Sequence, residues 1–271
     1  MKLSDVINDR YLNPNFFTKS YNSASPFPHI VMKNFIKENI LNKVVDEFPD
    51  LAKFKNQVKK FNNENEIKLN SQGMQILSPN ALHLNSYLNS DLMLSWLNSL
   101  TGIKETLISD PYLTGGGYHE IKKGGILKVH ADFNKHPKLD LDRRLNMIIY
   151  LNKNWQEQWG GALELFDKKI NSIKKIYPMF NTAIIFSTTS FTFHGHPEPL
   201  ICPEDQSRKS FAYYYYSTGR PNNEIVAENH GTLFVERLSK NFTKKLFLKN
   251  VIKKFIPPII VDIINKLKNY I

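Results

Sequence analysis

A histidine and an aspartate two residues apart, His130 and Asp132, form the clearest chemical pattern in the sequence. Residues 129–133 alternate apolar and polar side chains, as a β-strand does, and two glycines precede them. Side chains two residues apart on a strand point the same way, so this imidazole and carboxylate can share one cation. They supply two ligands of the two-histidine, one-carboxylate face that holds non-haem Fe(II) and leaves positions open for O2 and a substrate.

The third ligand of such a site has two candidates in the segment 193–197, which reads Phe-His-Gly-His-Pro. His194 comes first after the apolar run 182–186, and we expect it to complete the ligand set. His196 is the alternative, and the histidine that does not bind metal is expected to line the substrate pocket. A His-x-Asp pair alone arises on many strands by chance, so the surrounding motifs must show whether this pair belongs to a metal site.

The N-terminal part of the chain predicts helices. Apolar residues recur at helical spacing in residues 34–48 and again in residues 80–100, which predicts one helix and then one or two more, with Gly102 as the stop. Residues 26–32 predict a short extended segment. Two stretches lack a clear period. Residues 1–24 are expected to wrap the body loosely, and residues 51–75 are expected to form a surface loop or irregular excursion.

From residue 114 onward, short apolar runs are separated by Gly, Asn and Pro, which is typical of an all-β core. The expected strands are 118–121, 127–133, 145–151, 162–166, 173–177, 182–186 and 210–216. Helices followed by strands predict a mainly β fold, in which the N-terminal helices pack on one sheet of a β-sandwich or jelly-roll barrel.

The overall composition, with 41% hydrophobic and 23% charged residues, is that of an ordinary globular protein. Cys202 is the single cysteine, so no intrachain disulfide forms, which fits a reducing cytosol. The first residues lack the apolar core of a signal peptide, and no stretch reaches the roughly 18–20 apolar residues that cross a bilayer. We therefore expect a cytoplasmic protein.

Positive charge is concentrated at the C-terminus. The formal net charge is +11, and residues 240–271 carry +7 of it, with eight Lys and one acid. With 30 Lys against six Arg, the chain lacks the arginine bias of phosphate readers, so we expect no nucleic-acid partner. Apolar residues interleave with the C-terminal lysines at near-helical spacing. Such a tail either packs on the body or on a second subunit, or makes peripheral contact with an anionic membrane.

The segment 143–155, an Arg-led apolar strand that ends Tyr-Leu-Asn and is followed by a Trp, resembles a motif of the Fe(II)/2-oxoglutarate-dependent oxygenases. Within that superfamily it is most similar to the prolyl 4-hydroxylase and prolyl hydroxylase domain group, and the Gly160-Gly161 pair and the strand after it extend the match. The order Tyr, His-x-Asp, Tyr-Leu-Asn, Trp, Gly-Gly, His and Arg-x-Ser is kept over residues 112–216. The resemblance implies a double-stranded β-helix, which is a jelly roll of the cupin type.

This resemblance implies roles for the ligand candidates. His130, Asp132 and His194 hold Fe(II), while 2-oxoglutarate and O2 fill the remaining positions. The second histidine departs from the family's His-x-x-x-Pro spacing, because His194 lies five residues and His196 three residues before Pro199.

It also implies residues that bind 2-oxoglutarate. Arg208 and Ser210 match the Arg-x-Ser of the last core strand, where an Arg fork anchors the distal carboxylate. Lys209 is the alternative anchor. Tyr150 matches the Tyr of Tyr-Leu-Asn, and Tyr118 matches the Tyr before His-x-Asp, although its spacing is two residues longer and a core aromatic fits it equally well.

Other polar and aromatic residues receive simpler expectations. The histidines outside the ligand set are expected at the surface or in turns, and two tryptophans are expected to pack in the core, namely His29, His119, His136, Trp155 and Trp159. Asn134, just after the His-x-Asp pair, is a candidate for contact with substrate. The domain prediction is an oxygenase domain over 1–235, with a helical part at 1–110 and a jelly-roll core at 111–220, followed by the tail 236–271.

Together these features predict an Fe(II)- and 2-oxoglutarate-dependent dioxygenase that hydroxylates a C–H bond and forms succinate and CO2. A prolyl residue in a peptide or protein is the expected substrate, with a free amino acid or a sugar or lipid-linked glycan as alternatives, because such motifs say little about the substrate pocket. A non-catalytic sensor of metal and 2-oxoglutarate is the alternative of another class. A Zn(II) hydrolase uses similar ligands, but Arg208 with Tyr150 argues against it.

Overall fold

The computed structural model describes residues 2–225 and 229–236, and Met1–Val235 forms one compact unit. Glu236–Ile271 is a separate unit, of which only Glu236 is described. The predicted tail helices of residues 240–271 therefore lie outside the described residues, and the domain boundaries stay a prediction. Within the described ranges, no helix is both long enough and apolar enough to cross a bilayer.

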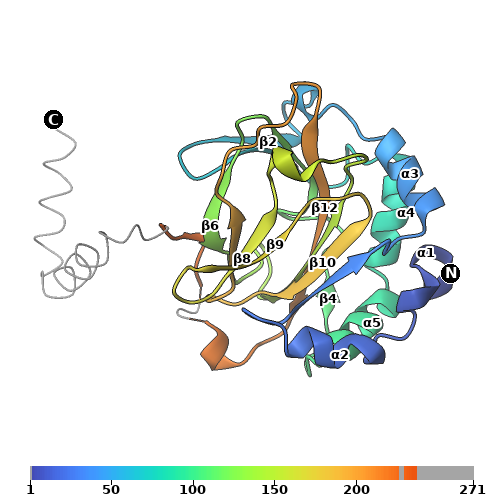
Figure 1. The fold of residues 1–271 in the computed structure, drawn as a ribbon. Helices are drawn as coiled ribbons and strands as arrows, with labels where there is room; N and C mark the ends of the chain where they lie inside the picture. The colour runs from blue at the N-terminus through green and yellow to red at the C-terminus, as the bar shows by residue number, and fades with distance from the viewer. Residues whose placement is uncertain (1, 226–228, 237–271) are drawn as a thin grey trace, which may run out of the picture. The chain divides into compact units, whose positions relative to one another are not determined.

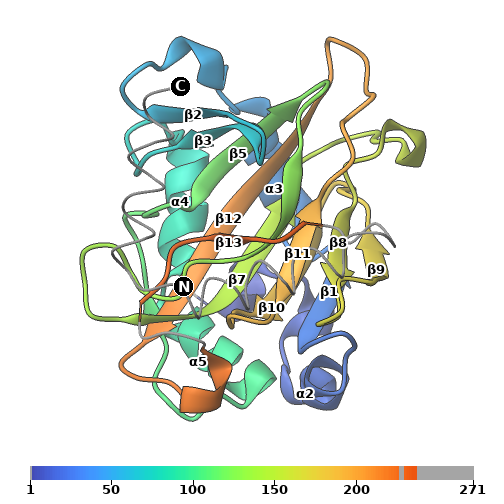
Figure 2. The ribbon, with the colours of Figure 1, turned by 90° about the vertical axis from the view of Figure 1, so that its left-hand side faces the viewer.

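Two antiparallel sheets form the body of the compact unit (Figures 1 and 2). The major sheet runs in the order β1 (His29–Lys33), β10 (Thr182–Ser187), β7 (Asp142–Tyr150), β12 (Ser207–Ser217), β5 (Gly117–Lys122), β3 (Ile67–Ser71) and β2 (Val58–Asn62), and β4 (Ile108–Ser109) pairs with β12. The minor sheet runs in the order β13 (Leu233–Phe234), β6 (Leu127–Ala131), β11 (Phe193–His196), β8 (Leu163–Phe166) and β9 (Ser172–Ile176). This arrangement confirms the predicted jelly roll, and each predicted strand has its counterpart.

Alternating side chains divide the core into two layers. Tyr150 and Ile184 of the major sheet pack against Leu163 and Leu165 of the minor sheet, and this cluster fills the space between the sheets. On the opposite face, residues of β7 and β12 such as Met147 join the helices in a larger cluster. Because neighbouring residues of a strand point to opposite faces, one strand serves both layers. The site described below faces the inner layer.

In the described part of the chain, α-helices cover the outer face of the major sheet (Figure 1). They are α1 (Leu3–Val6), α2 (Asn15–Asn22), α3 (Glu38–Asp46), α4 (Pro79–Leu88) and α5 (Asp91–Thr101). Ser78 and Ser90 cap the starts of α4 and α5 by accepting backbone amides, and α5 ends at Gly102 with φ +72°. The predicted helices at 34–48 and 80–100, and their stop at Gly102, are therefore confirmed.

Two predictions about irregular segments were wrong. Residues 51–75 contain the β2–β3 hairpin, whose strands have half-buried and exposed positions and therefore show little apolar alternation. Residues 1–24 are not loosely wrapped, because Val6, Tyr11 and Tyr21 are buried in the helical layer. Both stretches owe their order to contacts with distant parts of the chain, which a local period does not record.

Candidate iron and 2-oxoglutarate site

Three potential metal ligands meet on adjacent strands of the minor sheet. His130 of β6 is the register partner of His194 of β11, and Asp132 follows directly after β6. Asp132 Oδ1 lies 3.6 Å from His130 Nε2, and Asp132 Oδ2 lies 3.4 Å from His194 Nε2. All three residues are buried, and their ligand atoms lie within 4.8 Å of one another. The distances and the donor set fit one divalent cation of the non-haem iron type.

Hydrogen bonds behind the two histidines fix their orientation. His130 Nδ1 donates to the Lys128 carbonyl at 2.8 Å, and His194 Nδ1 donates to the Thr192 carbonyl at 3.0 Å. A carbonyl only accepts, so each Nδ1 carries a proton and each Nε2 faces the cluster. Burial lowers the pKa of His194 to about 4, although the Asp132 carboxylate acts in the opposite direction. At neutral pH the ring is therefore a neutral ligand.

Two side chains of β7 hold the Asp132 carboxylate. Asn146 Nδ2 donates to Asp132 Oδ2 at 2.7 Å, and Arg143 Nη2 lies 3.2 Å from the same oxygen. Burial acts to raise the pKa of Asp132, but Arg143 and His194 outweigh it and hold this pKa well below its usual range. The Arg143 guanidinium is itself enclosed between the rings of Phe133 and Tyr214, at 4.2 and 3.5 Å from their centroids. Asp132 is thus ionised and oriented before any metal arrives.

We expect the Asn146→Ala variant to bind Fe(II) about 10- to 100-fold more weakly, because the loss of a partner that orients a metal ligand has this typical effect. Asn181→Ala is the matched control, since Asn181 is also a buried amide but bonds the backbone of Ile36 instead. It is expected to lower stability and to leave Fe(II) affinity unchanged. Anaerobic titration of Fe(II) into each variant measures the difference, and equal affinities would contradict the role of Asn146.

A buried arginine side chain lies on the major sheet beside a tyrosine hydroxyl. Arg208 Nη2 donates to Tyr150 Oη at 3.1 Å, and Arg208 Nε donates to the Gly161 carbonyl at 2.8 Å. The register of β12 and β7 places Ser210 opposite Tyr150, on the same face as Arg208. Burial lowers the pKa of the Arg208 guanidinium, and the neighbouring Tyr150 acts in the opposite direction. This group of residues can bind a carboxylate at the inner face of the sheet.

The Gly160-Gly161 turn supports Arg208 through close packing. Gly161 has φ +71°, and a Cβ there would lie 2.6 Å from Leu200 Cδ2 and 3.0 Å from Arg208 Cδ. Trp155 packs with Leu200 in the same small cluster and donates to the Gly160 carbonyl, which confirms its predicted packing role. The turn therefore needs glycine for both its conformation and its clearance.

We expect Gly161→Ala to destabilise the protein by about 2–4 kcal/mol, which combines left-handed strain with overpacking. Gly124→Ala is the matched control, because Gly124 has φ +77° but no atom within 4 Å of the added Cβ. This control is expected to lower the free energy of unfolding only by the backbone strain, about 1–2 kcal/mol. Urea unfolding of both variants gives the difference, and equal losses would show that the clash is relieved at no cost.

The structure separates the remaining predicted residues. Tyr118 lies on the helical face of the sheet, where its ring centroid is 4.5 and 4.7 Å from those of Phe48 and Phe211, so the structure favours the core-aromatic alternative for this residue. The Lys209 ammonium lies 5.2 Å over the Phe48 ring on this same face. His196 is buried on β11 but does not belong to the metal-ligand cluster.

Several residues near the site were not identified from the sequence. His119 was expected at the surface or in a turn, but its Nε2 is buried, and burial followed by Lys68 lowers its pKa to about 3. On β5 it pairs with Ser210 and shares the inner face with Arg208 by strand alternation. The Oδ1 of Asn134, the candidate for contact with substrate, accepts a hydrogen bond from the His230 backbone amide at 2.8 Å. That contact joins Asn134 to the segment 229–236.

A hollow of about 230 Å³ opens at the metal-ligand cluster. His130 and Asp132 line it, together with Phe234 of β13, whose ring lies 5.5 Å from that of His130. Lys59 and Lys68 of the β2–β3 hairpin also contribute to its wall. No local pattern indicates Phe234 or the hairpin, because both reach the cluster only through strand pairing.

The comparisons with known proteins agree with this arrangement. The sequence profile of the 2OG-Fe(II) oxygenase superfamily matches residues 116–216, which contain the cluster and Arg208. A prolyl 4-hydroxylase of Pseudomonas putida superposes with a TM-score of 0.53 at 12% identity, covering 75% of this chain and 98% of that one. A Trichoplax adhaerens prolyl hydroxylase, solved with a peptide fragment of hypoxia inducible factor, gives 0.53 at 17% identity, covering 75% and 89%. These likenesses support the fold.

Among curated proteins, the mouse (Mus musculus) prolyl 3-hydroxylase OGFOD1 is 24% identical in an alignment of 231 residues that covers 77% of this chain. The match spans only 38% of the length of that relative. The family profile covers the strands that bear the candidate ligands and the buried arginine, as the motif order predicted. Residues 116–216 of this chain are thus similar to the 2OG-Fe(II) oxygenase superfamily over the segment that bears the candidate site.

Proposed function

We propose that this protein is an Fe(II)- and 2-oxoglutarate-dependent hydroxylase, with His130, Asp132 and His194 as iron ligands. Arg208, with Tyr150 and Ser210 beside it, binds the distal carboxylate of 2-oxoglutarate. The observation that carries the proposal is a preoriented ligand cluster on one sheet combined with a buried arginine–tyrosine pair on the other. When bound, the iron, 2-oxoglutarate and O2 together supply the oxidation of a C–H bond, with succinate and CO2 as co-products.

The side chains of the chain itself prepare the site for this chemistry. The Lys128 and Thr192 carbonyls hold the two histidine rings with their Nε2 atoms directed toward the cluster. Asn146 keeps the Asp132 carboxylate in place, and aromatic walls such as Phe234 limit the access of water. A zinc hydrolase has no use for an oxoacid anchor, so the Arg208–Tyr150 pair favours the oxygenase.

We propose a prolyl residue within a polypeptide as the substrate. The support is that the mouse relative is named a prolyl 3-hydroxylase and that the Trichoplax neighbour was solved with a peptide. A free amino acid or a sugar or lipid-linked glycan is the alternative class, and a non-catalytic sensor is the alternative of another kind.

The test is turnover of 2-oxoglutarate by the full chain, prepared without oxygen and loaded with Fe(II). Anaerobic 2-oxoglutarate should produce a weak visible absorption band, and a proline-containing peptide should stimulate succinate formation. If a glycan or an amino acid stimulates turnover and peptides do not, the prolyl assignment is wrong. A band without turnover on any member of the panel favours a sensor, whereas stoichiometric zinc with hydrolytic activity contradicts the oxygenase.

We further propose that residues 240–271 hold the protein at the cytoplasmic face of an anionic membrane. The support is the +7 charge of this tail, since each lysine near such a surface contributes about 1 kcal/mol. In co-sedimentation with phosphatidylserine vesicles at low salt, the full chain should pellet and a chain truncated after Ser239 should not. Equal behaviour of the two forms would contradict membrane contact, and an insoluble truncated form would instead indicate that the tail packs on the body.

A further inference from the structure

The outer edge of β2 is open among residues 2–225 and 229–236, because β2 is the last strand of the major sheet. Between two antiparallel strands, only every second pair of opposed residues exchanges backbone hydrogen bonds. The Gln72 amide donates to the Gln57 carbonyl, and the Asn63 amide donates to the Glu66 carbonyl. Both pairs continue the β2–β3 register, so the odd-numbered residues of β2 are the ones that bond to β3. The residues between them at even positions, such as Lys60, therefore direct their backbone N–H and C=O toward the open edge. An extended segment can pair there as an additional strand.

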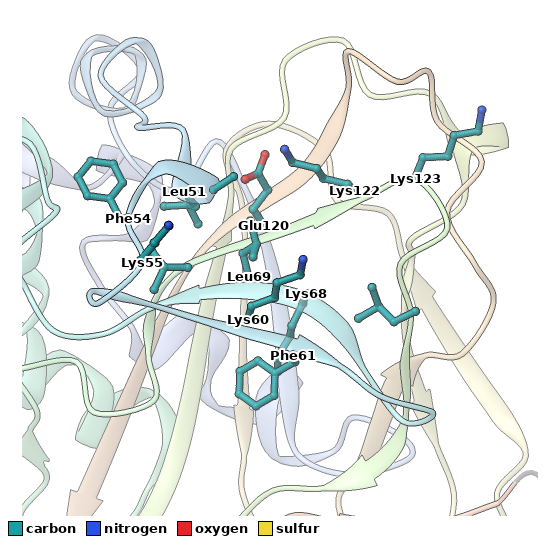
Figure 3. A pocket seen from close by; sticks show the side chains of 13 residues that line it. Leu51, Phe54, Lys55, Lys60, Phe61, Lys68, Leu69, Glu120, Lys122 and Lys123 are labelled. Carbon is teal, nitrogen blue, oxygen red and sulfur yellow. The ribbon is translucent and has the colours of Figure 1, made fainter.

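Hollows lie on both faces of this edge. On the helical side, a hollow of about 410 Å³ lies between β2, β3 and the turn Leu51–Lys53 (Figure 3), within the size range of binding pockets. On the inner side lies the hollow at the metal-ligand cluster. Phe61 and Lys68 line both of them. Because side chains of a strand alternate between faces, a strand added to β2 would direct alternate side chains toward the two hollows.

The charge around the edge is strongly positive. Figure 3 shows Lys55, Lys60 and Lys122 around the apolar side chains of the larger hollow, and Lys59 lies on the other face of β2. Lysines on an edge strand oppose pairing with an identical edge, since they would face their own copies. They attract acidic side chains instead, which favours an acidic segment over a second copy of the chain.

A buried acceptor provides an independent sign of a ligand. Glu120 is only 6% exposed and lines the larger hollow, where Figure 3 shows its carboxylate between Leu51 and Lys122. Its Oε1 accepts from Ser207, but its Oε2 is buried and has no hydrogen-bond partner among the described residues. Such an oxygen is costly to leave unsatisfied, so an inserted side chain with an N–H or O–H group would complete it.

We propose that an extended, acidic segment of a polypeptide partner adds to the edge of β2 as a new strand. Its backbone pairs with the free groups of β2, its acidic side chains meet the lysines, and alternate side chains enter the hollow over Glu120 and the mouth of the metal site. That this partner is the polypeptide substrate rests on the proposed function, whereas the binding of an acidic strand does not.

The test uses a fluorescein-labelled ten-residue peptide of alternating valine and glutamate, with fluorescence anisotropy of the full chain as the readout. The peptide is expected to bind, and its affinity is expected to fall as the salt concentration is raised. An alternating valine–lysine peptide, and a valine–glutamate peptide with alternate backbone N-methyl groups, are both expected to bind at least tenfold more weakly. Lys60→Pro should also weaken binding at least tenfold, because proline removes an outward N–H that the β2–β3 ladder does not use. Lys60→Gln removes only the charge and should weaken binding about threefold.

Equal binding of the N-methylated peptide, or of the lysine peptide, would overturn the proposal, and this comparison holds even if Lys60→Pro fails to fold. A stable dimer of the full chain that the peptide does not dissociate would also overturn it, by assigning the edge to a second copy. Wild-type turnover of 2-oxoglutarate is measured in parallel. That assay uses the proline-containing peptide and the rest of the panel described under Proposed function. Succinate formation without binding of the valine–glutamate peptide defeats this inference alone, and binding of that peptide without succinate from any member of the panel defeats the proposed function alone.

Discussion

Replacing His194 by alanine is expected to abolish stoichiometric Fe(II) binding and to reduce 2-oxoglutarate turnover about 10³-fold or more. A bound metal contributes several kcal/mol to such a reaction, and each 1.36 kcal/mol is tenfold in rate. His194 Nε2 lies 3.4 Å from Asp132 Oδ2 and its Nδ1 is already bonded to a backbone carbonyl, so the ring is fixed in a ligand position. No other described group offers a third ligand to the cluster.

His196→Ala is the matched control for this experiment. His196 is equally buried and lies two residues away on the same strand, so its loss perturbs β11 to a similar extent. It is expected to retain one Fe(II) per chain, because His196 does not belong to the ligand cluster. Metal content of both variants, purified without oxygen, gives the answer. An iron-free His196→Ala beside an iron-loaded His194→Ala would reverse the assignment of the third ligand.

Replacing Arg208 by alanine is expected to raise the KM for 2-oxoglutarate about 10²-fold. Truncation of one partner of a buried charge pair costs about 2–5 kcal/mol, and tenfold in affinity corresponds to about 1.4 kcal/mol. Arg208 is buried and its fork is positioned by Tyr150 and Gly161, so little ordering remains to be done when the co-substrate binds. Arg208→Lys keeps the charge but not the fork, and an intermediate KM is expected.

The control for the anchor is Lys209→Ala, which changes the adjacent residue. The Lys209 ammonium lies over the Phe48 ring on the helical face, so its removal should alter the KM for 2-oxoglutarate by less than about twofold. Steady-state succinate formation against 2-oxoglutarate concentration measures all three variants. A large rise in KM for Lys209→Ala, with little change for Arg208→Ala, would exchange their roles.

Short-range patterns were sufficient for much of this fold. Helical spacing and a glycine stop located the helices at 34–48 and 80–100, and short apolar runs located the strands of the jelly roll. The period of two along a strand also placed His130 and Asp132 on one side, as the cluster shows. Such predictions succeed because a repeat of two or 3.6 residues fixes which side chains share a face, whatever the partner element is.

Local periods and ordered motifs were therefore enough to predict the class of the fold, the resemblance to the 2OG-Fe(II) oxygenases and one pair of candidate ligands. The folded chain brings His194 rather than His196 into the cluster with His130, because the register between β6 and β11 pairs His194 with His130. It also placed Tyr118 in the helical layer, brought Asn146 behind Asp132 and added the β2–β3 hairpin to the sheet edge. These outcomes depend on pairing between strands far apart in the chain, whose register is set by the packing of the whole core rather than by neighbouring residues.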